Sequence, residues 1–215
     1  MKRMVLLALL ATVVSGCIDL GDRVVGTGDV VTQTRQVASF DRILTKGASH
    51  LQIAVGIPVS VKVEAQPNIQ EVIETTSSGG TLTVSEKKQY RTEKIARIII
   101  TAPSLSGLDI QGSSTATISG VHGPALDISI SGAGDVSASG NIGRLSLDSS
   151  GVGNADLRRL QSRDAVVRLS GVGNARVGPA STLDVSVNGV GSVTYLGSPR
   201  IVHQEIGGIG HIAHD

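Results

Sequence analysis

The residues with the clearest potential for chemistry recur along the chain in one short motif, a Gly-x-Gly pair followed by a polar side chain. Glycine pairs can cradle phosphates, and a column of carboxylate and amide oxygens can bind calcium or another polar ligand. The glycines are Gly132, Gly134, Gly151, Gly153, Gly171, Gly173, Gly189, Gly191, Gly208 and Gly210. The polar position, counting the related stretch 111–116 as the first copy, holds Thr115, Asp135, Asn154, Asn174, Ser192 and His211.

The spacing argues against both a nucleotide site and a calcium site. A dinucleotide fingerprint needs a third glycine three residues beyond the second, where a helix begins. Those positions hold Ser137, Asp156, Arg176, Thr194 and Ala213. Calcium-binding nonapeptides place an aspartate two residues after the last glycine in every nine residues, whereas Asp135 directly follows its glycine. We therefore interpret the polar column as a candidate binding face for a protein or glycan.

Metal chemistry and catalysis have little support in the sequence. The C-terminal stretch contains metal-ligand types in His203, Glu205, His211 and His214, but no His-x-x-x-His pair. Enzymes that act on polysaccharides use clustered carboxylates. Here the acids are spread one per repeat, at Asp109, Asp127, Asp148, Asp164 and Asp184, and the aromatic residues are limited to Phe40, Tyr90 and Tyr195. The sequence predicts a protein without catalytic residues, metal or cofactor, and an enzyme acting on envelope polysaccharide is the alternative.

The motif repeats at intervals of 19, 20, 18 and 19 residues, which is typical of stacked supersecondary units. Alternating residues, most of them aliphatic, precede each glycine pair, as in a strand with one buried face. They are Leu126, Ile128 and Ile130; Leu145, Leu147 and Ser149; Ala165, Val167 and Leu169; Leu183, Val185 and Val187; and Val202, Gln204 and Ile206. We expect all of these residues to face inward.

The corner residues carry further expectations. The residue between the glycines (Ala133, Val152, Val172, Val190, Ile209) and the second residue after them (Val136, Ala155, Ala175, Val193, Ile212) are predicted to face inward as well. The second glycine is predicted to turn the chain and so keep the polar column outside. The glycines themselves indicate backbone with φ above zero, or a corner where neighbouring coils approach too closely for a Cβ.

A coil of about 19 residues is too short for a βαβ unit. The sequence therefore predicts an all-β, single-chain parallel β-solenoid, with a β-sandwich of ordinary hairpins as the alternative.

The N-terminal half is predicted to be a less regular version of the same pattern. VGTGDV (25–30) is a close copy of SGAGDV (131–136), and KGASHL (46–51) is a looser one. Strands are predicted at 51–55, 59–63, 82–84 and 95–101, a short helix or turn at 67–74, and regular coils from Leu108. The charged run 86–94 is interpreted as a solvated loop, with a binding surface as the alternative.

Residues 1–16 resemble a lipoprotein signal peptide. Lys2 and Arg3 precede a short apolar run, and Val14-Ser15-Gly16 leads into Cys17, the only cysteine. This pattern resembles a bacterial lipobox, which predicts a lipidated Cys17, a short tether at 17–23 and a solenoid domain at 24–215. A plain signal peptide with an incidental cysteine is the alternative. Ile18 after the cysteine favours the outer membrane.

Removal of 1–16 takes away two of the 19 basic residues and none of the 18 acidic ones, so the mature chain is nearly neutral. Such a balance provides no long-range attraction to nucleic acid, which excludes nucleic-acid binding by charge. The partners expected are the membrane, through the N-terminal lipid, and a protein or glycan.

The order of several short elements resembles the family of bacterial envelope proteins with the putative auto-transporter adhesin, head GIN domain. The matching elements are Gly26-x-Gly28-Asp29-Val30, Phe40-Asp41-x-Ile43, Lys46-Gly47-Ala48 before Leu51-x-Ile53, Gly80-x-Leu82-x-Val84, and the later Ser-Gly-x-Gly-Asp/Asn repeats. Together they cover about residues 24–212. The resemblance implies a right-handed β-helix on an exported or lipid-anchored protein, and it brings no catalytic residues.

Three functional hypotheses remain open. The first is a non-catalytic envelope lipoprotein that presents a rigid solenoid to a protein or glycan partner. The second is the polysaccharide enzyme described above. The third is a structural element that forms a homo-oligomer, because the strand edges at the end of a solenoid must be capped or paired.

Overall fold

In the computed structural model of the protein, the residues described are 23–215. The expected signal peptide (1–16) and the candidate lipidation site Cys17 lie outside this range. The described residues form one short helix, α1 (Pro67–Gln70), and eighteen strands: β1 (Val24–Val25), β2 (Val31–Arg35), β3 (Arg42–Thr45), β4 (Ala48–Val55), β5 (Ser60–Ala65), β6 (Ile73–Ser78), β7 (Thr81–Glu86), β8 (Tyr90–Arg91), β9 (Arg97–Ala102), β10 (Gly107–Ile110), β11 (Ser113–Ile130), β12 (Ala133–Ser149), β13 (Ala155–Leu169), β14 (Ala175–Val177), β15 (Ala180–Val187), β16 (Val190–Tyr195), β17 (Arg200–Ile206) and β18 (Ile209–His214).

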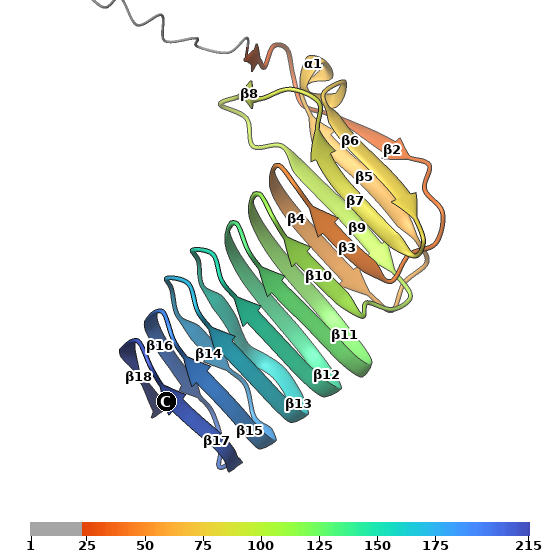
Figure 1. The fold of residues 1–215 in the computed structure, drawn as a ribbon. Helices are drawn as coiled ribbons and strands as arrows, with labels where there is room; N and C mark the ends of the chain where they lie inside the picture. Colours follow the sequence, from red (N-terminus) through yellow and green to blue (C-terminus); the bar gives the residue numbers. More distant parts are fainter. Residues whose placement is uncertain (1–22) are drawn as a thin grey trace, which may run out of the picture.

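Parallel strands stacked coil upon coil form the body of the molecule (Figure 1). One column of paired residues advances from Thr45 through Ile110, Ile130, Ser149, Leu169 and Val187 to Ile206. Every pairing along this column is parallel, whereas strands joined by hairpins pair antiparallel. The predicted parallel β-solenoid is therefore confirmed, and the β-sandwich alternative is excluded.

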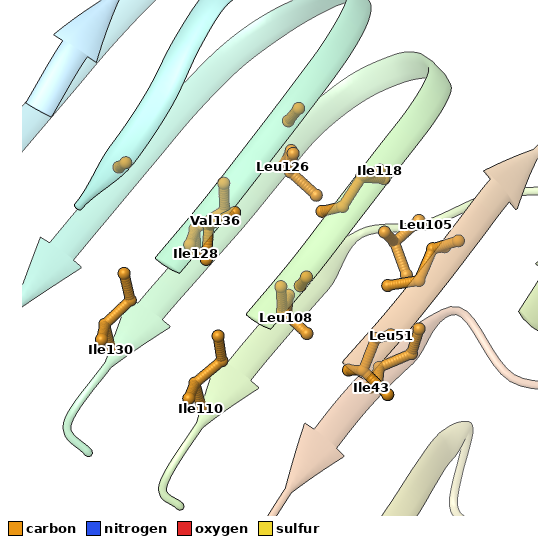
Figure 2. Packing of buried hydrophobic residues seen from close by; sticks show 14 of the residues in the cluster. Ile43, Leu51, Leu105, Leu108, Ile110, Ile118, Leu126, Ile128, Ile130 and Val136 are labelled. Carbon is orange, nitrogen blue, oxygen red and sulfur yellow. The ribbon is translucent and has the colours of Figure 1, made fainter. Parts of the chain in front are cut away.

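Aliphatic side chains fill the interior of the coils, where they pack in continuous columns (Figure 2). The residues that precede the first four corners are buried as predicted, from Leu126 to Val187 in steps of two within each coil. Val136, Ala155, Ala175 and Val193, just past those corners, are buried too, while Ile212 is half-buried. Fully burying one large aliphatic side chain contributes roughly 1.5–3 kcal/mol, so these columns are the main source of stability.

The prediction for the residues between the glycines is wrong. Val152, Val172, Val190 and Ile209 are exposed, at 56%, 50%, 48% and 74%, and Ala133 is exposed as well. The strand alternation continues through the corner without reversal, so that Val152 and Asn154 share the outer face and Gly153 and Ala155 the inner one. Hydrophobicity suggested burial, but the position relative to the paired strands decided the direction of these side chains.

Antiparallel strands close the N-terminal end. β5 pairs antiparallel with β2 and β9, and β6 pairs antiparallel with β7. The helix or turn expected at 67–74 is the single turn α1, which ends before β6 begins at Ile73. The motif at 25–30 is not a solenoid corner, because β1 pairs with β8 instead. The looser copy at 46–51 does form a solenoid corner, since Ala48 pairs with Ser113 and His50 with Thr115.

The last coil differs from those before it. Val202, Gln204 and Ile206 were predicted to face inward and be buried, yet all of β17 is exposed. No described coil covers the far side of β17, and its pairing with β15 shifts register between Leu183 and Asp184. Within residues 23–215, no helix is long and apolar enough to span a bilayer.

Candidate functional site

A ladder of hydrogen bonds runs along the polar column at the outer corner. The Oδ1 atom of Asp135 accepts from the backbone N–H of Asn154 at 2.9 Å and from its Nδ2 at 3.0 Å. The Oδ1 atom of Asn154 accepts in the same way from Asn174, at 3.2 Å for each donor. Asn174 Oδ1 accepts from the backbone N–H of Ser192 at 3.1 Å, and Ser192 Oγ lies 2.9 Å from His211 Nδ1.

These hydrogen bonds explain why the position is polar at Asp135, Asn154 and Asn174. The side-chain oxygen of each reaches the next coil and accepts its backbone N–H at the corner, which a hydrocarbon side chain cannot do. The sequence analysis missed the first member, His50, whose Nδ1 lies 2.6 Å from Thr115 Oγ1. The loose match of residues 46–51 to the repeat was the signal that could have revealed it. We call His50 and the six predicted residues the polar ladder.

The corner glycines are required by the close stacking of the coils. A Cβ on Gly173 would collide with the carbonyl oxygen of Gly153, and Gly173 has a φ of +149° that other residues rarely adopt. Both explanations proposed for the glycines therefore hold at this corner. In the first two coils the position of the second glycine holds Ser49 and Ser114, whose buried hydroxyls lie 3.0 Å and 2.9 Å from Thr45 Oγ1.

Beside the polar ladder runs an exposed column that we call the apolar ridge. It consists of Ala133, Val152, Val172, Val190 and Ile209, which pair directly with one another from coil to coil. The two preceding residues of the same column are Ala48 and Ser113. The side chains thus grow from small at the N-terminal end of the solenoid to large at the C-terminal end. A contiguous exposed apolar surface on a soluble domain usually marks a contact site.

The segment around β8 lies over the N-terminal end of this corner and forms a groove of about 720 Å³ with it. Tyr90 and Arg91 of β8 (Figure 1) and Ile95 line this groove. Asp135 and Val152 line it too, together with further residues of the polar ladder and the apolar ridge. Three residues of the charged run 86–94, namely Tyr90, Arg91 and Thr92, thus line this groove, and binding by the run stays a prediction.

Local contacts hold the β8 segment in place. Tyr90 Oη donates to the carbonyl oxygen of Ala48 at 3.2 Å, and Glu86 Oε1 accepts from the backbone N–H of Ala48 at 2.9 Å. Burial and the nearby charge of Glu86 raise the pKa of Tyr90 to about 12, so its hydroxyl keeps its proton at neutral pH. Burial also raises the pKa of Glu86. At its other end, Lys94 Nζ pairs with Asp29 at 2.8 Å.

The histidines and acids considered for metal binding or catalysis are dispersed. His203 Nε2 lies 3.5 Å from Glu205, His211 belongs to the polar ladder, and His214 packs edge-on against Tyr195. Among residues 23–215, no three metal-ligating side chains converge. Asp127 pairs with Arg42 at 3.6 Å, and Asp164 is held by Thr182 and Arg163, which lower the pKa of its carboxyl.

Comparisons with known proteins agree with this architecture. A "putative adhesin" from Bacteroides fragilis shares 23% identity, with a TM-score of 0.74 over 89% of this chain and all of that one. A "putative adhesin" from Parabacteroides distasonis has 16% identity and a TM-score of 0.58, over 90% of this chain and all of that one. A "putative lipid binding protein" from the same species has 20% identity and a TM-score of 0.53, over 90% of this chain and 99% of that one. At these identities the likeness concerns the fold alone.

No curated protein sequence matches the chain. The sequence model described as "Putative auto-transporter adhesin, head GIN domain" matches residues 39–199, well over half of the chain. The first four Gly-x-Gly corners, the coil that includes residues 46–51 and most of the antiparallel strands at the N-terminal end, the antiparallel cap, fall within that match, whereas the last coil lies beyond it. The chain therefore belongs to the putative auto-transporter adhesin, head GIN domain family.

Proposed function

We propose that this chain is a non-catalytic adhesion protein of the bacterial cell envelope and that the outer corner of the solenoid is its binding surface. The observation that carries this proposal is the groove beside β8, where charged, hydroxyl and aliphatic side chains converge on one rigid edge. Parallel coils hold these side chains at fixed spacing, so that binding would order few of them further. Family membership supports a role in adhesion.

We further propose that lipid on Cys17 anchors the protein, in the outer membrane if the cell has one. Val24, the first residue of β1, follows Cys17 by seven residue steps, and β1 pairs with β8. A fully extended chain of that length spans at most about 25 Å. The groove would then lie near the membrane and the later coils would project away from it.

Anchoring is tested by Cys17→Ala, which removes the thiol that lipidation requires. We expect the variant to leave the membrane fraction or to accumulate unprocessed. A Cys17→Ala protein that still floats with membranes after a high-salt wash would contradict the lipid anchor, while leaving the binding surface to be tested separately.

The binding surface is tested by attachment of cells that display the protein. The double variant Arg91→Glu and Val152→Asp changes two exposed residues that line the groove. We expect it to abolish attachment to other cells and to protein- or glycan-coated surfaces. Ile57→Asp, at an exposed turn that does not line the groove, is the matched control and should attach normally. Unchanged attachment of the double variant at equal surface levels would refute the proposal.

A further inference from the structure

The apolar ridge exposes a regular row of aliphatic side chains, of which only Ala133 and Val152 line the groove beside the β8 segment. Val152, Val172 and Val190 are each about half exposed, and Ile209 is 74% exposed. The polar ladder follows the ridge along its whole length and contains only one carboxylate, Asp135, and no lysine or arginine. An uncharged apolar row of this kind is suited to a protein surface with the same spacing.

We infer that the partner of this corner is a second copy of the same chain, packed side by side and antiparallel about Val172. This inference rests on the proposed function, because it names the partner of the same binding surface. Three features of the corner point to it: the repeat spacing, the gradient of side-chain size and the distribution of charge.

The repeat spacing makes the second copy a matching surface. Neighbouring coils are about 4.8 Å apart, the spacing of paired strands, so ridge side chains recur at that interval. A second ridge has the same interval, so each side chain of one row can meet a side chain of the other over all five coils. A surface without this repeat would match at one or two coils only.

The gradient of side-chain size selects the antiparallel orientation. A two-fold axis at Val172 brings Ile209 of one copy opposite Ala133 of the other, and Val190 opposite Val152. The largest side chain then faces the smallest, and the pairs in between are equal in size. A parallel arrangement would place Ile209 against Ile209 and Ala133 against Ala133, with a clash at one end and a gap at the other.

The charges along the polar ladder also favour the antiparallel orientation. The same axis places Asp135 opposite His211, Asn154 opposite Ser192 and Asn174 opposite its own equivalent. The one carboxylate in the ladder therefore meets an imidazole, and no like charges face each other within the ladder. Ile209 of the second copy would reach the groove beside Ala133, where the exposed Ile95 offers a further apolar contact.

Antiparallel packing has a direct consequence for adhesion. It places the N-terminal ends of the two copies at opposite ends of the pair, so lipid-anchored copies would sit in two different membranes. Antiparallel pairing would therefore join two cells that both display the protein. A parallel pair would form within one membrane.

Cross-linking through engineered cysteines in the full chain, extracted in detergent, tests the orientation. With a short bis-maleimide, Val172→Cys should form a covalent dimer alone, because the two-fold axis passes beside it. Val152→Cys and Val190→Cys should each remain largely monomeric alone and should cross-link when mixed. The unaltered chain controls for Cys17. Efficient dimers from Val152→Cys alone, or none from Val172→Cys and from the mixture, would overturn the inference.

Sedimentation of the detergent-extracted chain supplies a second measurement. Ile209→Asp places a carboxylate opposite Ala133 and near Asp135 of the other copy, and should weaken dimerisation about tenfold or more. Ile57→Asp should leave it unchanged. Equal dissociation constants for the two variants, or a monomer throughout, would refute self-pairing. Attachment to foreign surfaces that still depends on Arg91 and Val152 would then leave the proposed function intact.

Discussion

Valines of the interior and valines of the corner occupy opposite environments in this molecule. Val167, Val185 and Val193 have no exposed surface, whereas Val152, Val172 and Val190 are about half exposed. All six stand at positions that recur once per coil. The comparison shows that in this solenoid a side chain's direction follows from its place in the strand alternation, and that its hydrophobicity alone does not indicate burial.

We expect the largest difference in the free energy of unfolding between Val185→Asp and Val172→Asp. The side chain at position 185 has no exposed surface, so an unpaired carboxylate there would be buried, and we expect a loss of several kcal/mol in the free energy of unfolding. At position 172 the carboxylate would reach water, and we expect a change within about 0.5 kcal/mol in dilute protein. Urea unfolding monitored by circular dichroism measures both, and similar losses would contradict the outward orientation of the ridge.

The second prediction compares two glycines with φ above zero. Gly173→Ala combines a strained φ with a collision against the carbonyl oxygen of Gly153, and should cost roughly 2–4 kcal/mol. Gly123 has a φ of +130° but open space around the position of a Cβ, so Gly123→Ala should cost only about 1 kcal/mol. Equal melting temperatures for the two variants would show that the close stacking of the corner coils adds nothing to the destabilisation by Gly173→Ala.

A smaller effect is expected from the polar ladder. Asn154→Ala removes the acceptor for the backbone N–H of Asn174 and should lower the free energy of unfolding by about 1 kcal/mol. Asn141→Ala is the matched control, since its exposed amide makes only a long contact of 3.4 Å to Gln161. Chemical denaturation of both variants decides whether the ladder stabilises the corner.

The smallest effect concerns an ion pair on the outer surface. Two hydrogen bonds from Arg158 lower the pKa of Asp156 to about 2. A lowered folded-state pKa stabilises the protein above the unfolded value near 4, and this contribution is lost as the pH falls through about 2. Because the pair is exposed, it should amount to less than about 1 kcal/mol. In Arg158→Gln this part of the pH dependence should disappear, and an unchanged acid profile would contradict the assignment.

The sequence by itself determined the solenoid architecture, the length of its coils and most of its interior. The evenly spaced glycine motif and the alternation before each corner leave few other folds, because strand period and coil period together define which residues stack. The polar column was also readable, since every coil places a hydrogen-bonding residue there. The sequence did not show that Asp135 and Asn154 serve the next coil's backbone, because that depends on the distance between coils.

Only the tertiary structure decided what surrounds the corner. Residues 25–30 match the repeat closely, yet they pair with β8 because the antiparallel cap occupies the place of a coil. Residues 46–51 match loosely and still form a coil, because backbone pairing tolerates the changed side chains. The groove joins Tyr90 to Asp135 and Val152 across long stretches of sequence. No local sequence pattern indicates that these residues lie close together, because their proximity arises from the way the cap packs against the first coils.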